Sequence, residues 1–277
     1  YIYYWLRTSE TQANLMNVAI GSAQKALTID SLRKLRISLP PVKEQKEISS
    51  ILSSIDDKIK LNIQVIKNLD EMTQAIFKSW FIDFEPFKDS EFEESEFGII
   101  PRGWRVGYIG DLLLETIGGD WGKETKQLNF NKEVYCIRGA DISELSKGNQ
   151  GKMPTRYILE KNLTNKKLSG NEIVIEISGG SPTQSTGRTV FISSVLLKQY
   201  GKPLICTNFC RVLKPKKGYY ALFIYHYLNY LYKKDVFFKF ENGTTGIKNL
   251  DINSLFTQYQ IILPDEDTLQ RFSDYVG

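Results

Sequence analysis

The residues that could perform acid–base or metal chemistry are few in this chain. It contains one histidine, His226, which stands in an aromatic run typical of a helix, so a Ser-His-Asp triad is not expected. Cys206 and Cys210 could bind zinc, but no second ligand pair accompanies them. With Cys136 they make an odd set of three without a CxxC pair, which fits a reducing cytoplasm. We therefore expect no metal, no cofactor and a cytoplasmic location.

Catalytic motifs are equally sparse. The chain has no P-loop, and neither Gly118-Gly119 nor Gly179-Gly180 belongs to a GxGxxG pattern. Pro40-Pro41 lacks the Asn or Asp and the aromatic residue with which adenine methyltransferases hold a flipped base. Glu172 and Glu176 flank Ile-Val-Ile in a strand pattern and are expected on its solvated face; part of an acidic nuclease site is the alternative. We predict that the chain is not an enzyme.

One loop has the residue types that read DNA. Gly179, Gly180 and Ser181 are small enough to let the backbone approach a duplex. Gln184 could pair with adenine, and Arg188 with guanine or a phosphate. Two plainer alternatives stay open: the segment is an ordinary polar hairpin loop, or Arg188 pairs with a neighbouring carboxylate.

Three further loops resemble it in composition. One runs from Gly243 to Lys248, and the basic residue at its end suits phosphate contact. A second is the glycine-rich stretch from Gly118 to Lys123, and the third is Arg138-Gly139. The candidate DNA-binding residues outside the first loop are Thr244, Thr245, Lys248, Gln24, Lys25, Trp121, Lys123 and Arg138.

Charge is unevenly distributed along the sequence. The net charge is +4, but residues 81–97 hold seven acids against Lys88, a net of −6. Residues 101–277 carry 24 Lys+Arg and 17 Asp+Glu, a net of +7. A moderately basic domain suits phosphate binding, although an ordinary basic surface would have the same charge.

A long helix is predicted from Val42 to Trp80. Pro40-Pro41 ends the preceding segment, and no Gly or Pro follows before the end of the run. Apolar residues recur at the spacing of a coiled-coil seam, which needs a partner helix. The alternative is a helix packed on its own domain. The seam consists of Leu52, Ile55, Ile59, Ile66, Leu69, Ile76 and Trp80, with Asn62 and Thr73 as its polar members.

After the helix the pattern changes to that of an α+β domain. Residues 83–100 form an acidic linker rich in turn residues. Beyond it, helices are predicted at Asp111–Thr116 and Tyr219–Lys234, and a further helix begins at Asp265. Short apolar runs predict strands at Trp104–Ile109, Val134–Ile137, Glu172–Ile177, Thr189–Ile192, Arg211–Leu213 and Tyr259–Leu263.

The chain also contains an internal repeat, in which residues 1–40 resemble residues 223–264. The run Ile2–Leu6 matches Ile224–Leu228, and Leu39-Pro40 matches Leu263-Pro264. Between them Gly21 matches Gly243, so Gln24 and Lys25 lie in the counterpart of the Gly243–Lys248 loop. Chance matching of apolar residues is the alternative, but the anchors keep their order and drift by only two residues. We expect one module to occur twice, separated by the long helix.

Several stretches resemble the DNA-specificity subunit of type I restriction-modification systems. LPPVKEQKEISSILSSIDDKI resembles the strand end and central helix of that family, and GIIPRGWRVGYIGDLL the start of its recognition domain. NEIVIEISGGSPTQSTGRTVFI, TNFCRVLKP and GTTGIKNLDINSLFTQYQIILP resemble its following strands and loops. The resemblance implies an α+β target-recognition domain with a twisted β-sheet and helices, plus a long coiled-coil-type spacer helix.

The resemblance also implies a domain order. Residues 1–41 correspond to the C-terminal tail of a first target-recognition domain, 42–82 to the central spacer helix and 83–100 to the linker. Residues 101–264 correspond to the second recognition domain and 265–277 to the start of a distal helix. Most of the first domain of the family is missing here. The chain is thus either a fragment or a half-reader of which two copies combine.

The function implied is non-catalytic reading of one half of a bipartite target in double-stranded DNA. Two methyltransferase (M) subunits would dock on the helices, and a restriction-motor (R) subunit would join them. Self-association through the long helix is a further expectation. The alternatives are the recognition end of a fused restriction-methylation enzyme and a coiled-coil adaptor that binds no DNA.

Overall fold

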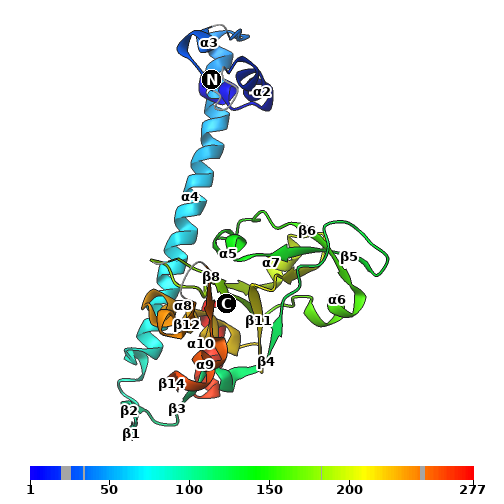
Figure 1. The fold of residues 1–277 in the computed structure, drawn as a ribbon. Coiled ribbons are helices and arrows are strands. Elements are labelled where there is room, and N and C mark those ends of the chain that lie inside the picture. Colours follow the sequence, from blue (N-terminus) through cyan, green and yellow to red (C-terminus); the bar gives the residue numbers. More distant parts are fainter. Residues whose placement is uncertain (20–25, 34, 182, 244–246) are drawn as a thin grey trace. The chain divides into compact units, whose positions relative to one another are not determined.

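The computed structural model describes residues 1–19, 26–33, 35–181, 183–243 and 247–277. The chain divides into two compact units, Tyr1–Asn68 and Leu69–Gly277. The division falls inside helix α4 (Val42–Phe81), which contributes residues to both units (Figure 1). The described part of the first unit is chiefly helical, and the second contains both strands and helices, so the expected α+β class is confirmed.

Helix α4 forms because forty consecutive residues contain no helix breaker. No Gly or Pro occurs between Pro41 and Pro86. At its start Gln45 satisfies two carbonyls: its backbone N–H donates to Pro41 O at 3.0 Å, and its Nε2 donates to Pro40 O at 2.8 Å. The observed helix extends one residue beyond the predicted end at Trp80. The long helix expected from the heptad pattern is therefore confirmed.

The apolar seam of α4 is largely uncovered in the described structure. Ile55 and Ile59 are each 51% exposed, and Leu69 is 55% exposed. By contrast, Phe77 and Phe81 in the last turns are 2% exposed and belong to the core of the second unit. Packing against the chain's own domain thus accounts for the end of α4, while most of the seam lacks a cover.

Three short helices complete the first unit: α1 (Ile2–Leu6), α2 (Ser9–Val18) and α3 (Ile29–Arg33). Thr8 caps α2, because its Oγ1 accepts a hydrogen bond from the backbone N–H of Thr11 at 3.3 Å. The hydroxyl of Tyr4 donates to Asp56 Oδ2 of α4 at 2.9 Å, which ties α1 to the long helix.

The two copies of the repeat agree only in part: α1 and α3 correspond to parts of α8 (Tyr220–Lys233) and α9 (Ile252–Gln258), whereas the second copy also contains three short strands that the described residues of the first copy lack. In the second copy, β14 (Gln260–Leu263) pairs antiparallel with β3 (Arg105–Tyr108). In the first copy, the described residues 35–41 form neither a helix nor a strand. A strand needs a neighbour for its N–H and C=O groups, and the described first unit offers none to this segment.

The strands of the second unit form five small sheets in the part of the chain that is described, rather than one continuous sheet. Sheets of two strands are β1 (Phe92–Ser95) with β2 (Gly98–Pro101), and β14 with β3. The four-stranded sheet has the order β4 (Leu113–Gly118), β11 (Cys210–Pro215), β7 (Glu172–Glu176), β9 (Thr189–Ile192). The three-stranded sheets are β10 (Leu204–Cys206), β5 (Phe130–Ile137), β6 (Thr155–Leu159), and β12 (Glu241–Asn242), β13 (Lys248–Leu250), β8 (Ser178–Gly179).

Helices of the second unit pack on these sheets (Figure 1). One aromatic cluster joins the end of α4 to α8 (Tyr220–Lys233) and α10 (Glu266–Val276). The ring of Phe81 lies 4.9 Å from that of Phe223 and 4.8 Å from that of Phe272. The remaining helical elements are α5 (Gly139–Leu145), α6 (Glu160–Lys166), α7 (Ser194–Lys198), α9 (Ile252–Gln258) and the 3-10 turns η1 (Glu85–Phe87), η2 (Ile109–Leu112) and η3 (Val236–Phe240).

The predicted helix at Asp111–Thr116 is wrong. Asp111 instead closes the short turn η2, where its Oδ2 accepts a hydrogen bond from Tyr108 N at 3.2 Å. The following residues form β4, which pairs with β11. This cross-strand pairing overrides the local helix preference. The six predicted strands all occur, with ends shifted by up to a few residues.

The acidic segment 83–100 is more ordered than a linker. It contains η1 and the β1–β2 hairpin, in which Glu93 pairs with Ile100. Phe87 and Ile100 are buried in the aromatic core, at 9% and 2% exposure. These two apolar residues hold the segment on the domain despite its charge.

Candidate nucleic-acid interface

Hydrogen bonds hold the described residues of the loop that follows β7. The backbone N–H of Ser181 donates to Gln184 O at 2.7 Å, and Gln184 Nε2 donates to the hydroxyl of Tyr232 at 3.1 Å. Gly180 has a φ of +72°, and a Cβ there would lie 2.8 Å from Thr186 Oγ1. The glycine is therefore required by both conformation and space.

Pairing between β8 and β13 brings two candidate loops together. Gly179 is the partner of Lys248 in this ladder, so the loop after β7 and the end of the Gly243–Lys248 loop lie side by side. Four candidates, namely Gln24, Lys25, Thr244 and Thr245, lie outside the described residues.

Arg188 pairs with a buried carboxylate. Its Nη2 lies 2.6 Å from Glu176 Oε1, and its Nε lies 2.9 Å from Glu176 Oε2. The hydrogen bonds that Arg188 donates to Glu176 raise the pKa of its guanidinium, which stays charged. Of the interpretations left open by the sequence, pairing of Arg188 with a neighbouring carboxylate is the one observed. The Arg188 side chain is still 29% exposed.

The expected solvated position of Glu172 and Glu176 is wrong. They are 5% and 3% exposed because β7 lies between β11 and β9 and is covered on both faces. Burial raises the pKa of Glu172, whose Oε2 accepts a hydrogen bond from Ser169 N at 2.8 Å. Among the described residues, no group of three or more His, Cys, Asp or Glu side chains could hold a metal ion.

Two glycines leave space for the Glu176 carboxylate. A Cβ at Gly139 would lie 2.1 Å from Glu176 Oε1, and one at Gly179 would lie 2.7 Å from the same atom. The Arg138-Gly139 segment and the loop after β7 therefore converge on a single carboxylate, which the separate sequence motifs do not reveal.

Lys248 is also neutralised by a buried carboxylate. Its Nζ lies 2.9 Å from Glu241 Oε2, and Glu241 is 5% exposed in its side chain. Glu241 Oε1 accepts a further hydrogen bond from the backbone N–H of Thr186. Lys248 thus helps to hold the loop after β7 as well as contributing charge.

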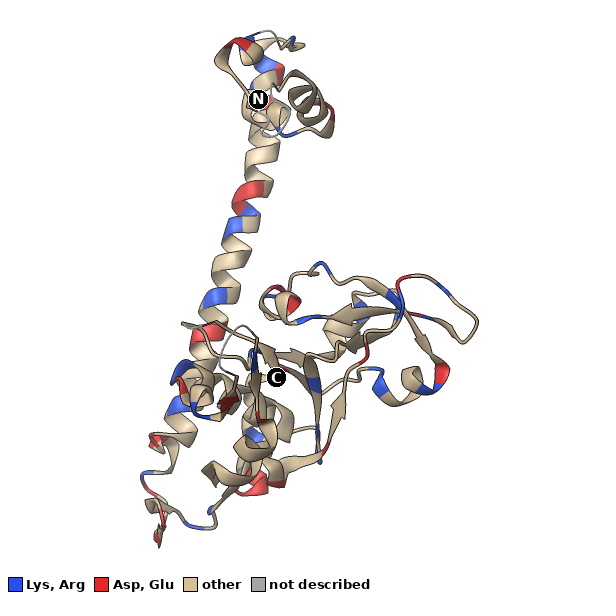
Figure 2. Ribbon diagram, viewed as in Figure 1, with Lys and Arg blue, Asp and Glu red and all other residues tan. Residues whose placement is uncertain are grey.

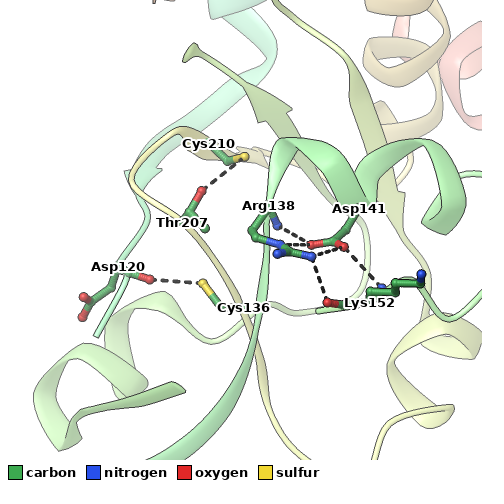
Figure 3. Close-up of polar contacts among 7 residues, drawn as sticks. All are labelled: Asp120, Cys136, Arg138, Asp141, Lys152, Thr207 and Cys210. Carbon is green, nitrogen blue, oxygen red and sulfur yellow. Dashed lines mark hydrogen bonds and ion pairs between the residues drawn. The ribbon is translucent and has the colours of Figure 1, made fainter. Parts of the chain in front are cut away.

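Arg138 is also paired with a buried carboxylate, that of Asp141 (Figure 3). Its Nε and Nη2 donate to the two oxygens of Asp141, at 2.8 and 3.0 Å, and Nη2 also donates to Lys152 O at 2.8 Å. Asp141 is 3% exposed; burial alone would raise its pKa, but the hydrogen bonds from Arg138 outweigh this and lower it. The guanidinium is held side-on, and its Nη1 makes no hydrogen bond to a described residue.

Trp121 and Lys123 occupy the loop after β4. The Arg156 guanidinium carbon lies 4.0 Å from the centre of the Trp121 ring, and Arg156 Nε donates to Trp121 O at 2.8 Å. Lys123 pairs through its backbone with Tyr157, and its Nζ lies 5.6 Å from the Phe130 ring. Trp121 remains 38% exposed, so the part of its ring that Arg156 does not cover is open to a ligand.

A hollow of about 410 Å³ joins these segments. Trp121, Arg138 and Glu176 line it, together with residues that were not among the candidates, which include Ser178, Asn208 and Phe209. The last two lie inside the stretch TNFCRVLKP. The signal that could have identified Phe209 is an aromatic residue between two apolar strand patterns. The sequence alone does not show whether such a ring is exposed.

Figure 2 shows that Lys and Arg are interspersed with Asp and Glu along the second unit. The net charge of +7 over residues 101–277 therefore does not gather into one basic segment. Contact with a phosphate backbone would draw on scattered cations, while the rigid polar loops supply neutral hydrogen-bonding groups.

The cysteines and the histidine are interior residues. Burial raises the pKa of Cys136 and of Cys210 to about 12, and that of Cys206 well above its usual value, so all three are neutral thiols. His226 lies in α8 at 7% exposure, as a helix residue, and burial lowers its pKa to about 4. None of the described helices is long and apolar enough to cross a membrane.

The second unit thus combines polar loops with a framework of small sheets and the end of a long helix. Residues 1–71 and 101–274 match the family described as the type I restriction modification DNA specificity domain. The chain belongs to this family.

Two relatives illustrate the similarity. The MjaIX specificity subunit of a type I restriction enzyme from Methanocaldococcus jannaschii is 28% identical, over 100% of this chain and 61% of that protein. The HindI specificity subunit from Haemophilus influenzae is 42% identical over 44% of this chain and 24% of that protein. The chain thus spans less than two thirds of the length of these relatives.

Solved structures also resemble the chain. The S subunit of the type I system from M. genitalium has a TM-score of 0.49 and 16% identity, covering 94% of this chain and 60% of the other. The HsdS subunit from Thermoanaerobacter tengcongensis has a TM-score of 0.42 and 15% identity, covering 99% and 60%.

Proposed function

We propose that this chain reads one half of a bipartite target in double-stranded DNA for a type I methyltransferase. The observation that carries the proposal is the family match to two separate ranges, residues 1–71, which include most of α4, and residues 101–274. A reader built from two recognition domains held apart by a helix suits a target that is split into two halves.

The loops of the second unit support direct reading of bases. Specific contact requires side chains held in fixed positions, so that a mismatched base leaves their polar groups unsatisfied. Arg138 and Arg188 are each held side-on by a buried carboxylate, which fixes the direction of the guanidinium. Gln184 is oriented by Tyr232 in the adjoining turn.

Helix α4 has two proposed roles, as a spacer between half-sites and as a docking surface for two methyltransferase subunits, which a restriction-motor subunit joins. Its exposed seam, with Ile55 and Ile59 each 51% exposed, supports contact with another helix. Self-association of two copies through this seam is the variant of the proposal that would complete a bipartite reader from a half-length chain.

The chain itself neither methylates nor cuts DNA in this proposal. The methyltransferase subunits supply S-adenosylmethionine and the methyl transfer. The single histidine is buried and neutral, and the carboxylates at the loop bases are engaged by arginines, which supports a reading role rather than a catalytic one. The buried free thiols suit a reducing cytoplasm.

The test is DNA binding by the chain purified with its methyltransferase subunits. We expect retardation of a target duplex in a gel, with affinity that falls as salt rises and that exceeds the affinity for unrelated duplex by about a thousandfold or more. Absence of salt-dependent binding would favour a protein adaptor. Methyl transfer or cleavage by the chain alone would favour a fused enzyme.

A further inference from the structure

The turn between β10 and β11 displays two side chains to solvent from a buried base. Thr207 is 3% exposed and Cys210 0% exposed, whereas Phe209 between them is 55% exposed. Asn208 is exposed too, and its amide makes no hydrogen bond to a described residue. A large apolar ring and a free amide thus stand side by side on the surface.

The turn is rigid because other strands hold its backbone. Thr207 N donates to Ile137 O at 3.0 Å, and Cys210 N donates to Thr207 O at 2.9 Å. Ile177 N donates to Phe209 O at 2.8 Å, which links the turn to the end of β7. A ligand that meets these side chains therefore need not order the loop first, so little conformational entropy is lost on binding.

The neighbours of the turn extend the surface. Asn208 and Phe209 line the hollow of about 410 Å³ together with Trp121 and Arg138. Trp121 presents an aromatic face that Arg156 supports from 4.0 Å, and Arg138 is fixed by Asp141, while its Nη1 makes no hydrogen bond to a described residue. The hollow thus offers two aromatic rings, one amide and one guanidinium edge, beside Glu176, whose charge is paired with Arg188.

This chemistry matches base edges better than the phosphate backbone. Phosphates are bound mainly by cations and backbone N–H groups, but the two displayed residues of the turn carry no charge. An Asn amide has the donor and acceptor that pair with adenine N7 and N6, and a Phe ring makes apolar contact with a thymine methyl group.

We infer that Asn208 and Phe209 read an A·T pair within the half-site recognised by the second unit. This inference rests on the proposed function, since it assumes that the unit meets DNA. The inference adds to that function two residues that determine the preferred DNA sequence, and the base pair that they select. Arg138, at the other wall of the hollow, contacts the adjoining position.

The test is selection of bound sequences from a random duplex library by the chain with its methyltransferase subunits. For the unaltered protein, the selected motif should contain an A·T pair whose preference is lost in Asn208→Ala and Phe209→Ala. Each variant should discriminate about 10-fold to 100-fold less at that position and bind unrelated duplex as before. Asn208→Asp should disfavour adenine there and favour cytosine, whose N4 amino group is a donor.

Val195→Ala is the matched control, because this apolar side chain is 66% exposed on α7, away from the hollow, and should leave the motif unchanged. Melting temperatures of all variants establish that they fold. An unchanged motif in folded Asn208 and Phe209 variants would overturn the inference while leaving the proposed function intact. Uniform weakening on every sequence with a smaller salt slope would also overturn it, because that result indicates phosphate contact. Failure of the unaltered protein to select any motif would instead contradict the proposed function.

Discussion

Arg188 Nη2 lies 2.6 Å from Oε1 of Glu176, and this carboxylate is 3% exposed. The two residues stand at opposite ends of the loop between β7 and β9, and Glu176 N also donates to Arg188 O at 2.9 Å. The ion pair therefore closes the loop at its base. Gly139 and Gly179 approach the same carboxylate, so that one buried charge organises two of the candidate recognition segments.

Removal of this carboxylate should destabilise the domain. In Glu176→Ala the Arg188 guanidinium is left partly buried without a partner, and we expect a loss of about 2–4 kcal/mol in the free energy of unfolding. Chemical denaturation measures it. Glu144→Ala is the control, because that carboxylate meets Lys147 at 3.2 Å with 49% of its side chain exposed, and its loss should cost under about 0.5 kcal/mol. Equal effects of the two substitutions would show that the buried pair has no special role.

A methyl group at Gly139 should be poorly tolerated. Its Cβ would lie 2.1 Å from Glu176 Oε1, so Gly139→Ala must displace the carboxylate or the backbone, at a cost of about 1–3 kcal/mol. Gly201→Ala is the matched control, since no atom lies within 4 Å of a Cβ there. Thermal denaturation of both variants, and of Gly139→Ala combined with Glu176→Ala, measures the effect. Strictly additive losses in the double variant would contradict a clash with this carboxylate.

His226 should make the fold sensitive to acid. Burial lowers its pKa from 6.5 to about 4, so the unfolded chain binds a proton at a pH where the folded chain does not. Stability should therefore be present in full above pH 6.5 and decline as the pH falls toward 4, by up to about 3 kcal/mol. Urea titrations at several pH values should show a shallower decline for His226→Gln than for the unaltered chain. Parallel pH profiles would exclude His226 as the cause.

The seam of α4 should be needed for assembly but not for folding of the chain. Ile59 is 51% exposed, and Ile59→Glu should change the free energy of unfolding by no more than about 0.5 kcal/mol. It should nevertheless weaken association with the methyltransferase subunits or with a second copy, because it introduces a charge into the apolar contact. Leu61→Glu, also at an exposed apolar residue but on the opposite face of the helix, is the control for co-purification. Full assembly of the Ile59 variant would contradict the docking role of the seam.

The regular elements could be predicted where the pattern is local. The range of α4 follows from forty residues without Gly or Pro, and β9 follows from a short β-branched run. Asp111–Thr116 shows the limit of this reasoning: its composition suits a helix, but β11 offers hydrogen bonds that make Leu113–Gly118 a strand. Propensity yields to pairing with a segment nearly a hundred residues away.

The candidate site could be predicted in its loops but not in its pairings. The sequence indicates Arg188 as a base or phosphate contact, whereas the partner Glu176 was expected in solvent; its burial depends on strands that flank β7 on both sides. Asn208 and Phe209 were missed because their display depends on backbone hydrogen bonds from Thr207 to Ile137 O and from Ile177 to Phe209 O, which tie the turn to other strands. These contacts join segments that are far apart in the chain, so they leave no pattern in the local sequence.

The central claim is that the chain directs a methyltransferase to a split DNA target. Sequencing of methylated bases in the genome of cells with and without this chain tests it most directly. We predict that removal of the chain abolishes methylation at one bipartite adenine motif, and that restoring the chain restores the same motif. An unchanged methylation pattern in a strain that retains the active methyltransferase subunits would contradict the account.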